Sequence, residues 1–361
     1  MIELLNQDIN LKLRFRKILF CQGYWCPIEV ELSQYDNVES MIKRISLTDL
    51  DVLGIKYDYL FNGFRIVGDC KTGKNISDIS RLFWLKGVKD YFGADEAYYI
   101  HSNVKNHTKN ITPKLGLRVL DEKSLSELEK NLNIIHYFLP LSDISEYEKV
   151  SNQWNIKIPR GTKLNENQLL FKKIYTYLSY SYWYIEQYRN LLNVIENFSS
   201  ISSLLDPRND KHVLLAFTGL ERFAHSMLEA ASYVFSQGSD NVPRDFRTYI
   251  YGGPLSLREK ETFFKLMREL TKTNEQLDPP FIVDLYELMG RMVRNPMGAF
   301  DILRHIQAIY LWCVHLRNDK LLPLDNDQQN TAAIVLTRDL AKTFCKITGL
   351  NADLFRSINA L

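Results

Sequence analysis

The sequence contains little cysteine, and the cysteines it has are scattered. Among 361 residues there are five, an odd number, and no two of them have the Cys-x-x-Cys spacing of many zinc sites and redox pairs. This pattern argues against a zinc site and against a disulfide framework. It favours a protein that works in a reducing compartment.

Long apolar runs are also missing. The longest ones, such as HIQAIYLWCVHL, fall short of the roughly 20 residues that a membrane-spanning helix needs. The first ten residues, MIELLNQDIN, have neither the basic start nor the apolar core of a secretory signal. We therefore expect a cytoplasmic protein that does not enter a membrane.

Positive and negative charges are nearly balanced. Lysine and arginine number 45 and aspartate and glutamate 43, for a formal charge of +2. The chain therefore lacks the large positive charge of a protein that coats nucleic acids, and any site for a polyanion must be a local patch. The one glycine-rich loop, YGGPL, lacks the lysine and spacing of a phosphate-binding loop, so nucleotide hydrolysis is not indicated.

The length and the change of texture along the chain predict two domains. A mass of 42.3 kDa exceeds what one hydrophobic core usually supports. Residues 1–145 mix β-branched runs with helical segments and predict an α/β domain with a mixed sheet flanked by helices. Residues 169–361 give one amphipathic run after another and predict an all-α domain, with a linker at 146–168.

The first domain has a readable order of elements. Residues 5–23 predict a helix that ends at Gly23, although the alternation in LKLRFRK also fits a strand. Strands follow at 25–33, 47–61 and 64–73, and Asn62-Gly63 predicts a tight hairpin turn between the last two. A helix capped by Ser77 or Asp78 and stopped by Gly93 then leads to a strand at 96–102.

The hairpin brings three chemical groups together. Side chains alternate along a strand, so Asp69 and Lys71 share one face, and pairing with the preceding strand places Asp51 beside them. Two carboxylates suit a hard cation such as Mg²⁺ or Mn²⁺, and the carbonyl of Cys70 is a plausible further ligand. A lysine there can stabilise charge that develops on a phosphate. The alternative is a surface hairpin whose acid and lysine are solvated and paired with each other.

These residues resemble a known family. LDVLG at 50–54, followed by DCK at 69–71, is similar to the core of PD-(D/E)XK nucleases, the restriction-endonuclease-like proteins. The resemblance spans about residues 10–120. It implies Asp51 and Asp69 as metal ligands and Lys71 as the catalytic lysine.

The match has departures, and some positions stay open. Leu50 stands where the family name has proline, and Asp69 is shorter than the commoner glutamate. Many members add an acid from the first helix, for which Glu3 and Asp8 are both candidates. Lys74 and Arg81 are candidates for contacts with the substrate phosphate, with plain solvated roles as the alternative.

The resemblance implies a metal-dependent nuclease, with DNA favoured over RNA, of the kind found among prokaryotic defence and restriction enzymes. Two alternatives remain. One is a ribonuclease. The other is a non-catalytic adaptor that keeps the nuclease fold as a scaffold and binds a partner through its helices.

The helical domain offers weaker signals. Glu221, His225 and Glu229 share one helix face, which is more typical of ion pairs than of a metal site, because the matching Glu-x-x-His motifs on other helices are missing. The tyrosine-rich stretch YTYLSYSYWYIEQY fits core packing, stacking on bases or the interface of a homodimer. We expect this domain to recognise a substrate, a partner protein or a second copy of the chain.

Overall fold

The computed structural model describes residues 2–38, 41–72, 77–132, 164–238, 241–272, 276–311 and 331–359. The chain divides into two compact units. Unit 1 consists of Met1–Lys56, Gly63–Ile158 and Gln307–Gln329, and unit 2 of Tyr57–Asn62, Pro159–Ile306 and Asn330–Leu361. The predicted linker at 146–168 lies largely outside the described residues. No helix within the described ranges is both long and apolar enough to cross a bilayer.

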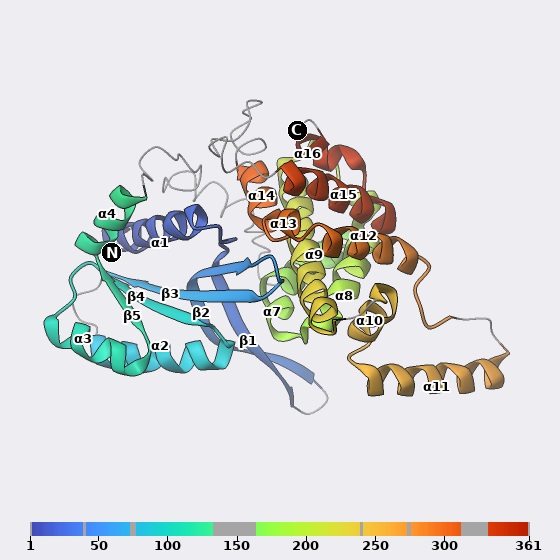
Figure 1. Ribbon diagram of the computed structural model, residues 1–361, viewed down its shortest axis with the longest axis horizontal. Coiled ribbons are helices and arrows are strands. Elements are labelled where there is room, and N and C mark those ends of the chain that lie inside the picture. The colour runs from blue at the N-terminus through green and yellow to red at the C-terminus, as the bar shows by residue number, and fades with distance from the viewer. Residues whose placement is uncertain are drawn as a thin grey trace. The chain divides into compact units, whose positions relative to one another are not determined.

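Unit 1 is a five-stranded mixed sheet with helices on both faces (Figure 1). The strands lie in the order β1-β2-β3-β4-β5. The elements are α1 (Ile2–Cys21), β1 (Ile28–Val38), β2 (Met41–Tyr57), β3 (Gly63–Lys71), α2 (Asp78–Phe92), β4 (Glu96–His101), α3 (Asn106–Ile111), a 3₁₀ turn (Thr112–Leu115), β5 (Arg118–Asp121) and α4 (Glu122–Asn131). The predicted α/β character is confirmed.

Strand direction changes in the middle of the sheet. β1 is antiparallel to β2, and the five-residue connection between β2 and β3 is too short for a parallel crossover. β3, β4 and β5 are parallel, with Lys71, His101 and Asp121 level with one another at their carboxyl ends. The order helix, strand, hairpin, helix, strand is as the sequence predicts. The alternative that LKLRFRK is a strand is wrong, because these residues lie inside α1.

Helix α2 begins and ends where its sequence predicts. The side chain of Ser77 accepts a hydrogen bond from the amide of Ser80, and Gly93 adopts the left-handed conformation, with φ of 69°, that terminates helices. α1 and α4 cover one face of the sheet, and α2 and α3 the other (Figure 1). The sheet is therefore sandwiched between two layers of helices.

The packing of α1 on β3 depends on a glycine. A Cβ atom at Gly68 would lie 2.7 Å from the ring of Phe15, closer than real side chains approach. The missing side chain lets α1 lie directly on the strand. Since Gly68 faces α1, the alternating side chains of Asp69 and Lys71 face the side of the sheet that carries α2.

The turn between β2 and β3 differs from the predicted one. The Asn62-Gly63 pair does not supply the positive φ angles; Phe61 does, with φ of 61°. Asp58 organises the loop, because its carboxylate accepts hydrogen bonds from the amides of Leu60 and Asn62 at 2.8 and 2.9 Å. Phe61, which belongs to unit 2 with the rest of this loop, is fully buried against Phe235 of the same unit, so packing of one aromatic ring outweighs the local preference of the pair.

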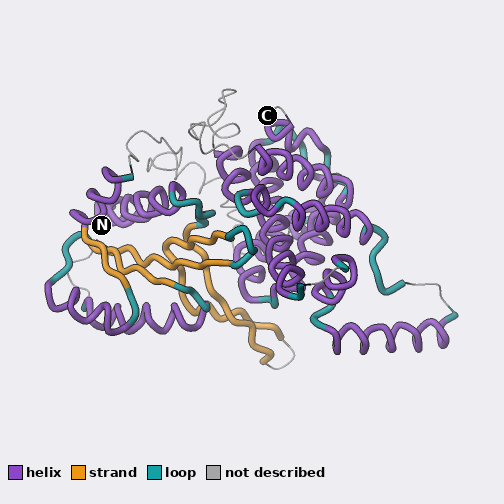
Figure 2. Tube along the Cα trace, in the orientation of Figure 1, coloured by secondary structure: helices purple, strands orange, loops and turns teal. Residues whose placement is uncertain are grey.

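Unit 2 is helical, as predicted (Figure 2). Its elements are α6 (Glu166–Thr176), a π-helix (Tyr177–Ser181), α7 (Tyr182–Tyr184), α8 (Gln187–Ile201), a 3₁₀ turn (Ser202–Leu204), α9 (Asp210–Ser236), α10 (Val242–Ile250), α11 (Pro254–Thr271), α12 (Ile282–Arg294), α13 (Pro296–Ala299), α14 (Ile302–Ile309, whose last residues fall in unit 1), α15 (Thr331–Thr348), a 3₁₀ turn (Ala352–Phe355) and α16 (Arg356–Asn359).

The core of unit 2 forms around α9. This helix is 27 residues long and buries most of its apolar side chains against α8, α10, α12 and α15. Stacked and edge-on aromatic rings fill the centre, including Phe198, Phe223 and Phe344. α11 differs from its neighbours in that none of its residues is buried.

A buried carboxylate and lysine cluster at the end of the central strands

The structure brings Asp51, Asp69 and Lys71 together, as the sequence predicts. Asp51 comes from β2, and Asp69 and Lys71 belong to the carboxyl end of β3. The ammonium nitrogen of Lys71 lies 3.1 Å from Oδ2 of Asp51 and 3.7 Å from Oδ1 of Asp69. A single ammonium group therefore bridges two carboxylates on neighbouring strands.

Both carboxylates are buried. The side chains of Asp51 and Asp69 are each 2 % exposed, whereas that of Lys71 is 21 % exposed. The alternative of a solvated surface hairpin does not fit such burial. A buried carboxylate stays ionised only where cations and hydrogen-bond donors surround it, and the cluster supplies both.

Asp51 has partners on several sides. Its Oδ2 accepts a hydrogen bond of 2.7 Å from the backbone amide of Cys70. Its Oδ1 forms an ion pair of 2.8 Å with the ammonium of Lys12, which comes from α1 and is 11 % exposed. Burial opposes ionisation, but Lys12 and Lys71 together hold the pKa of Asp51 below its ordinary value. Burial alone would lower the pKa of Lys12, but the nearby carboxylate of Asp51 raises it above its ordinary value.

Asp69 is held by an arginine. Arg81, from the first turn of α2, donates from Nε and Nη2 to the two carboxylate oxygens of Asp69, both at 2.7 Å. This is the bidentate geometry in which arginine binds a carboxylate most strongly. The guanidinium also stacks on Trp84, with 3.5 Å between its central carbon and the ring centroid. Burial raises the pKa of Asp69, and Arg81 opposes that shift.

The remaining predicted residues have mixed outcomes. The thiol of Cys70 is fully buried and burial raises its pKa, while the backbone amide of the same residue contacts Asp51. Of the two first-helix acids, Asp8 accepts a hydrogen bond from the hydroxyl of Thr72, next to Lys71. The side chain of Glu3 and all of Lys74 lie outside the described residues.

Lys12 is a member of the cluster that the sequence patterns did not predict. It could have been found, because Ile9 and Phe15, three residues before and after it, lie on the same face of α1 and are buried. A lysine on the buried face of a helix needs an acid to pair with. The sequence places two acids at the end of the strands that α1 covers.

A divalent cation fits this donor set in part. Carboxylate oxygens from adjacent strands are the ligands that Mg²⁺ prefers. Oδ1 of Asp51 is buried and, within the part of the chain described, has the ion pair with Lys12 but no hydrogen bond of good geometry. Among the described residues, no group of three or more histidine, cysteine, aspartate or glutamate side chains could hold a metal. A cation held by Asp51 and Asp69 would need water or substrate oxygens as its further ligands.

The predicted helix face of Glu221, His225 and Glu229 belongs to α9 of unit 2, where His225 and Glu229 contact neighbouring side chains. His225 is buried, its Nδ1 lies 2.6 Å from the hydroxyl of Tyr182, and its Nε2 lies 3.5 Å from Glu229. Glu229 also accepts a hydrogen bond of 2.5 Å from the hydroxyl of Tyr57. These contacts agree with a role in ion pairing and packing. Tyr177 and Tyr182, from the tyrosine-rich stretch, are likewise buried in this core.

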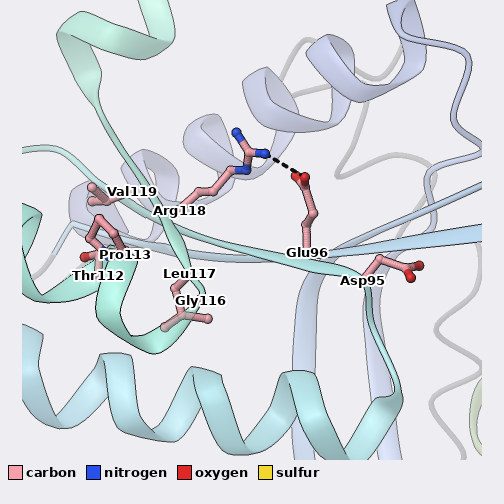
Figure 3. A pocket seen from close by; sticks show the side chains of 8 residues that line it. All are labelled: Asp95, Glu96, Thr112, Pro113, Gly116, Leu117, Arg118 and Val119. Atoms are coloured by element: carbon pink, nitrogen blue, oxygen red, sulfur yellow. Dashed lines mark hydrogen bonds and ion pairs between the residues drawn. The ribbon is translucent and has the colours of Figure 1, made fainter.

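A pocket lies at the other end of the parallel strands (Figure 3). Its volume is about 510 Å³, and it opens beside Glu96 and Arg118, the first residues of β4 and β5, which form an ion pair of 2.8 Å. Its other lining residues are Asp95, Thr112, Pro113, Gly116, Leu117 and Val119. Because Lys71 is the last residue of β3, the pocket and the carboxylate cluster lie at opposite ends of the parallel strands.

Comparison of the chain with models of known protein families, with curated proteins and with solved structures found no match. The likeness to PD-(D/E)XK nucleases therefore rests on the residues of β2 and β3 and on their arrangement.

Proposed function

We propose that unit 1 is a metal-dependent nuclease that hydrolyses phosphodiester bonds, with DNA as the favoured substrate. The observation that carries this proposal is the ammonium of Lys71 between two buried carboxylates, 3.1 Å from Asp51 and 3.7 Å from Asp69. Burying two acids is costly, and a structural hairpin gains little from it. The arrangement is chemically useful where cations and a phosphate must meet.

Hydrolysis requires three things of the site. A water oxygen must form a bond to phosphorus, the bond from phosphorus to the leaving oxygen must break, and the water proton must end on that oxygen through solvent. Asp51 and Asp69 would hold Mg²⁺ or Mn²⁺, which when bound polarises the phosphoryl group and makes a coordinated water more acidic. The carbonyl of Cys70 stays a candidate ligand.

The chain's own cations have separate tasks in this proposal. Lys71 is the most exposed member of the bridge, and its ammonium can donate to a phosphate oxygen while charge develops there. Arg81 fixes the carboxylate of Asp69 in one rotamer and is close enough to the cluster to bind a phosphate. Lys12 holds Asp51 ionised from the side of α1.

One observation favours the adaptor alternative. Each carboxylate oxygen of Asp51 and Asp69 already has a cationic partner in Lys12, Lys71 or Arg81. A chain that had exchanged its metal for its own lysines and arginine would keep this fold without cleaving anything. Metal binding and cleavage must therefore be measured separately.

The experiment compares the wild-type chain with Lys71→Met, Asp69→Asn and the control Lys86→Met on supercoiled plasmid DNA with Mg²⁺ or Mn²⁺. Lys86 is an exposed lysine on α2, paired with Asp90 and not with the cluster. We expect Lys71→Met to lower the cleavage rate by about 100-fold or more, the usual cost of removing one group that stabilises transition-state charge. The control should cleave like wild type.

Further arms separate the alternatives. A labelled single-stranded RNA in the same buffers identifies a ribonuclease. Calorimetric titration with Mn²⁺ tests the metal site without turnover, and Asp51→Asn should abolish the binding. A folded wild-type chain that neither binds Mn²⁺ nor cleaves DNA or RNA would refute the nuclease and leave the adaptor. Equal cleavage by wild type, Lys71→Met and Asp69→Asn would place the activity elsewhere.

A further inference from the structure

Helix α11 of unit 2 carries an apolar face that its own unit leaves uncovered. Five large apolar side chains on it are exposed by 39 to 80 %: Leu255, Phe263, Leu266, Met267 and Leu270. Exposed apolar patches of this kind mark interaction surfaces, because contact with a partner removes their apolar area from water. We call these five side chains the α11 stripe.

The α11 stripe has the geometry of a helix-pairing surface. At about 100° per residue, its members fall within an arc of about 120°, the width of the face that a helix usually buries, and exposed Glu259 is the charged residue inside this arc. The helix is fixed to its unit by other residues in its first half. Glu261 pairs with Arg247 at 2.5 Å, and the ammonium of Lys260 donates to the carbonyl of Tyr251 at 2.8 Å. Beyond them, residues 265–271 are all exposed.

We propose that the α11 stripe pairs with the same stripe of a second copy of this chain, with the two helices antiparallel. The charges beside the stripe carry this choice of partner. Arg258 and Glu269 lie on the same flank of the helix, about 20° apart in projection and eleven residues apart in sequence. Both are exposed, and within the described residues neither has an ion pair.

A two-fold axis between residues 263 and 264 makes these charges complementary. It sets Arg258 of each copy level with Glu269 of the other and so creates two symmetric ion pairs beside the stripe. Phe263 meets its own counterpart at the centre, and Leu270 packs near Leu255 of the other copy. A parallel, in-register pair would instead place the flank that carries Arg258 and Glu269 on opposite sides of the seam in the two copies, where these charges cannot pair. The helix is thus self-complementary in one orientation, as an isologous interface must be.

The test measures the mass of the full-length chain in solution as a function of concentration. The wild-type chain should shift from 42.3 kDa to about twice that value over the micromolar range. Leu266→Glu combined with Leu270→Glu should weaken dimerisation by at least about tenfold, because it places four charges in one apolar seam. Both positions are exposed, so the variant should match the wild-type circular dichroism spectrum and melting temperature.

A charge exchange tests the orientation. Arg258→Glu and Glu269→Arg should each weaken the dimer several-fold, and the two together should restore it, because the exchanged pairs are again opposite in sign. The matched control is Val283→Glu, which changes an apolar side chain on α12 that is 59 % exposed and outside the stripe. It should leave the dimer unchanged.

Three results would overturn the proposal. The chain could stay monomeric up to about 100 μM, in which case another part of the chain or another protein covers the stripe. The dimer could survive the double leucine change, which would locate the interface elsewhere. The charge exchange could fail to restore pairing, which would exclude the antiparallel arrangement. None of these readouts depends on nuclease activity.

Discussion

Removing Lys12 tests whether the carboxylate cluster is held by opposing charges. Lys12→Met keeps the length and apolar stem of the side chain but deletes the ammonium that lies 2.8 Å from Asp51. Deleting one partner of a buried ion pair costs about 3 to 5 kcal/mol, since it leaves the other charge uncompensated. Asp51 keeps Lys71 at 3.1 Å and the amide of Cys70 at 2.7 Å, so we expect about 3 kcal/mol, at the lower end of that range.

The measurement is urea unfolding read by hydrogen exchange on peptides from β2 and β3, which report on unit 1 separately from the helices. With a urea dependence of about 2 kcal/mol per molar, a loss of about 3 kcal/mol moves the midpoint down by about 1.5 M. The control is Lys86→Met, which breaks the exposed ion pair with Asp90 at 2.5 Å. Such a surface pair contributes less than about 0.5 kcal/mol.

A double-mutant cycle isolates the pair itself. If Asp51→Leu is made in both backgrounds, the change at Lys12 should cost far less once the acid is gone, with a coupling free energy of about 1 to 3 kcal/mol. A cost for Lys12→Met as small as that of the control, or a coupling near zero, would refute the reasoning. The buried acid would then be stabilised by Lys71 and the backbone alone.

Three further predictions follow from single contacts. Lys12 and Lys71 hold the pKa of Asp51 below its ordinary value. The stability that Asp51 contributes is therefore complete above about pH 5 and is lost as the pH falls through its folded pKa. Acid unfolding followed by circular dichroism should be less steep for Asp51→Asn than for wild type. Gly68→Ala places a methyl group 2.7 Å from the ring of Phe15 and should lower the free energy of unfolding by about 1 to 3 kcal/mol, with partial rescue by Phe15→Leu; an unchanged urea midpoint would show that α1 can move away freely. Asp58→Ala removes the acceptor of two loop amides and should cost about 1 to 2 kcal/mol, whereas Asn62→Ala should cost less, which thermal melting of the two variants compares directly.

The elements of unit 1 and three members of the cluster could be predicted from the sequence alone. The two-residue period of a strand is enough to put Asp69 and Lys71 on one face, and a short hairpin is enough to bring Asp51 beside them. Ser77 and Gly93 fix the two ends of α2 by local hydrogen bonds and backbone conformation, which depend only on neighbouring residues. Patterns that involve only residues close in the sequence can be recognised without a structure.

The charges that surround those acids and the conformation of the hairpin turn depend instead on contacts between segments that are distant in the sequence. Lys12 lies 39 residues before Asp51. The apolar face of α1 indicates that Lys12 needs an acid as partner, but the helix pattern does not say which acid it meets. The close packing of α1 on β3, at Gly68 and the ring of Phe15, makes the contact with Asp51 possible. The conformation of the turn also depends on a distant contact, because the burial of Phe61 against α9 outweighs the preference of Asn62-Gly63 for a tight turn. Burial and long-range pairing depend on where distant segments come to rest, so they are set by the whole fold.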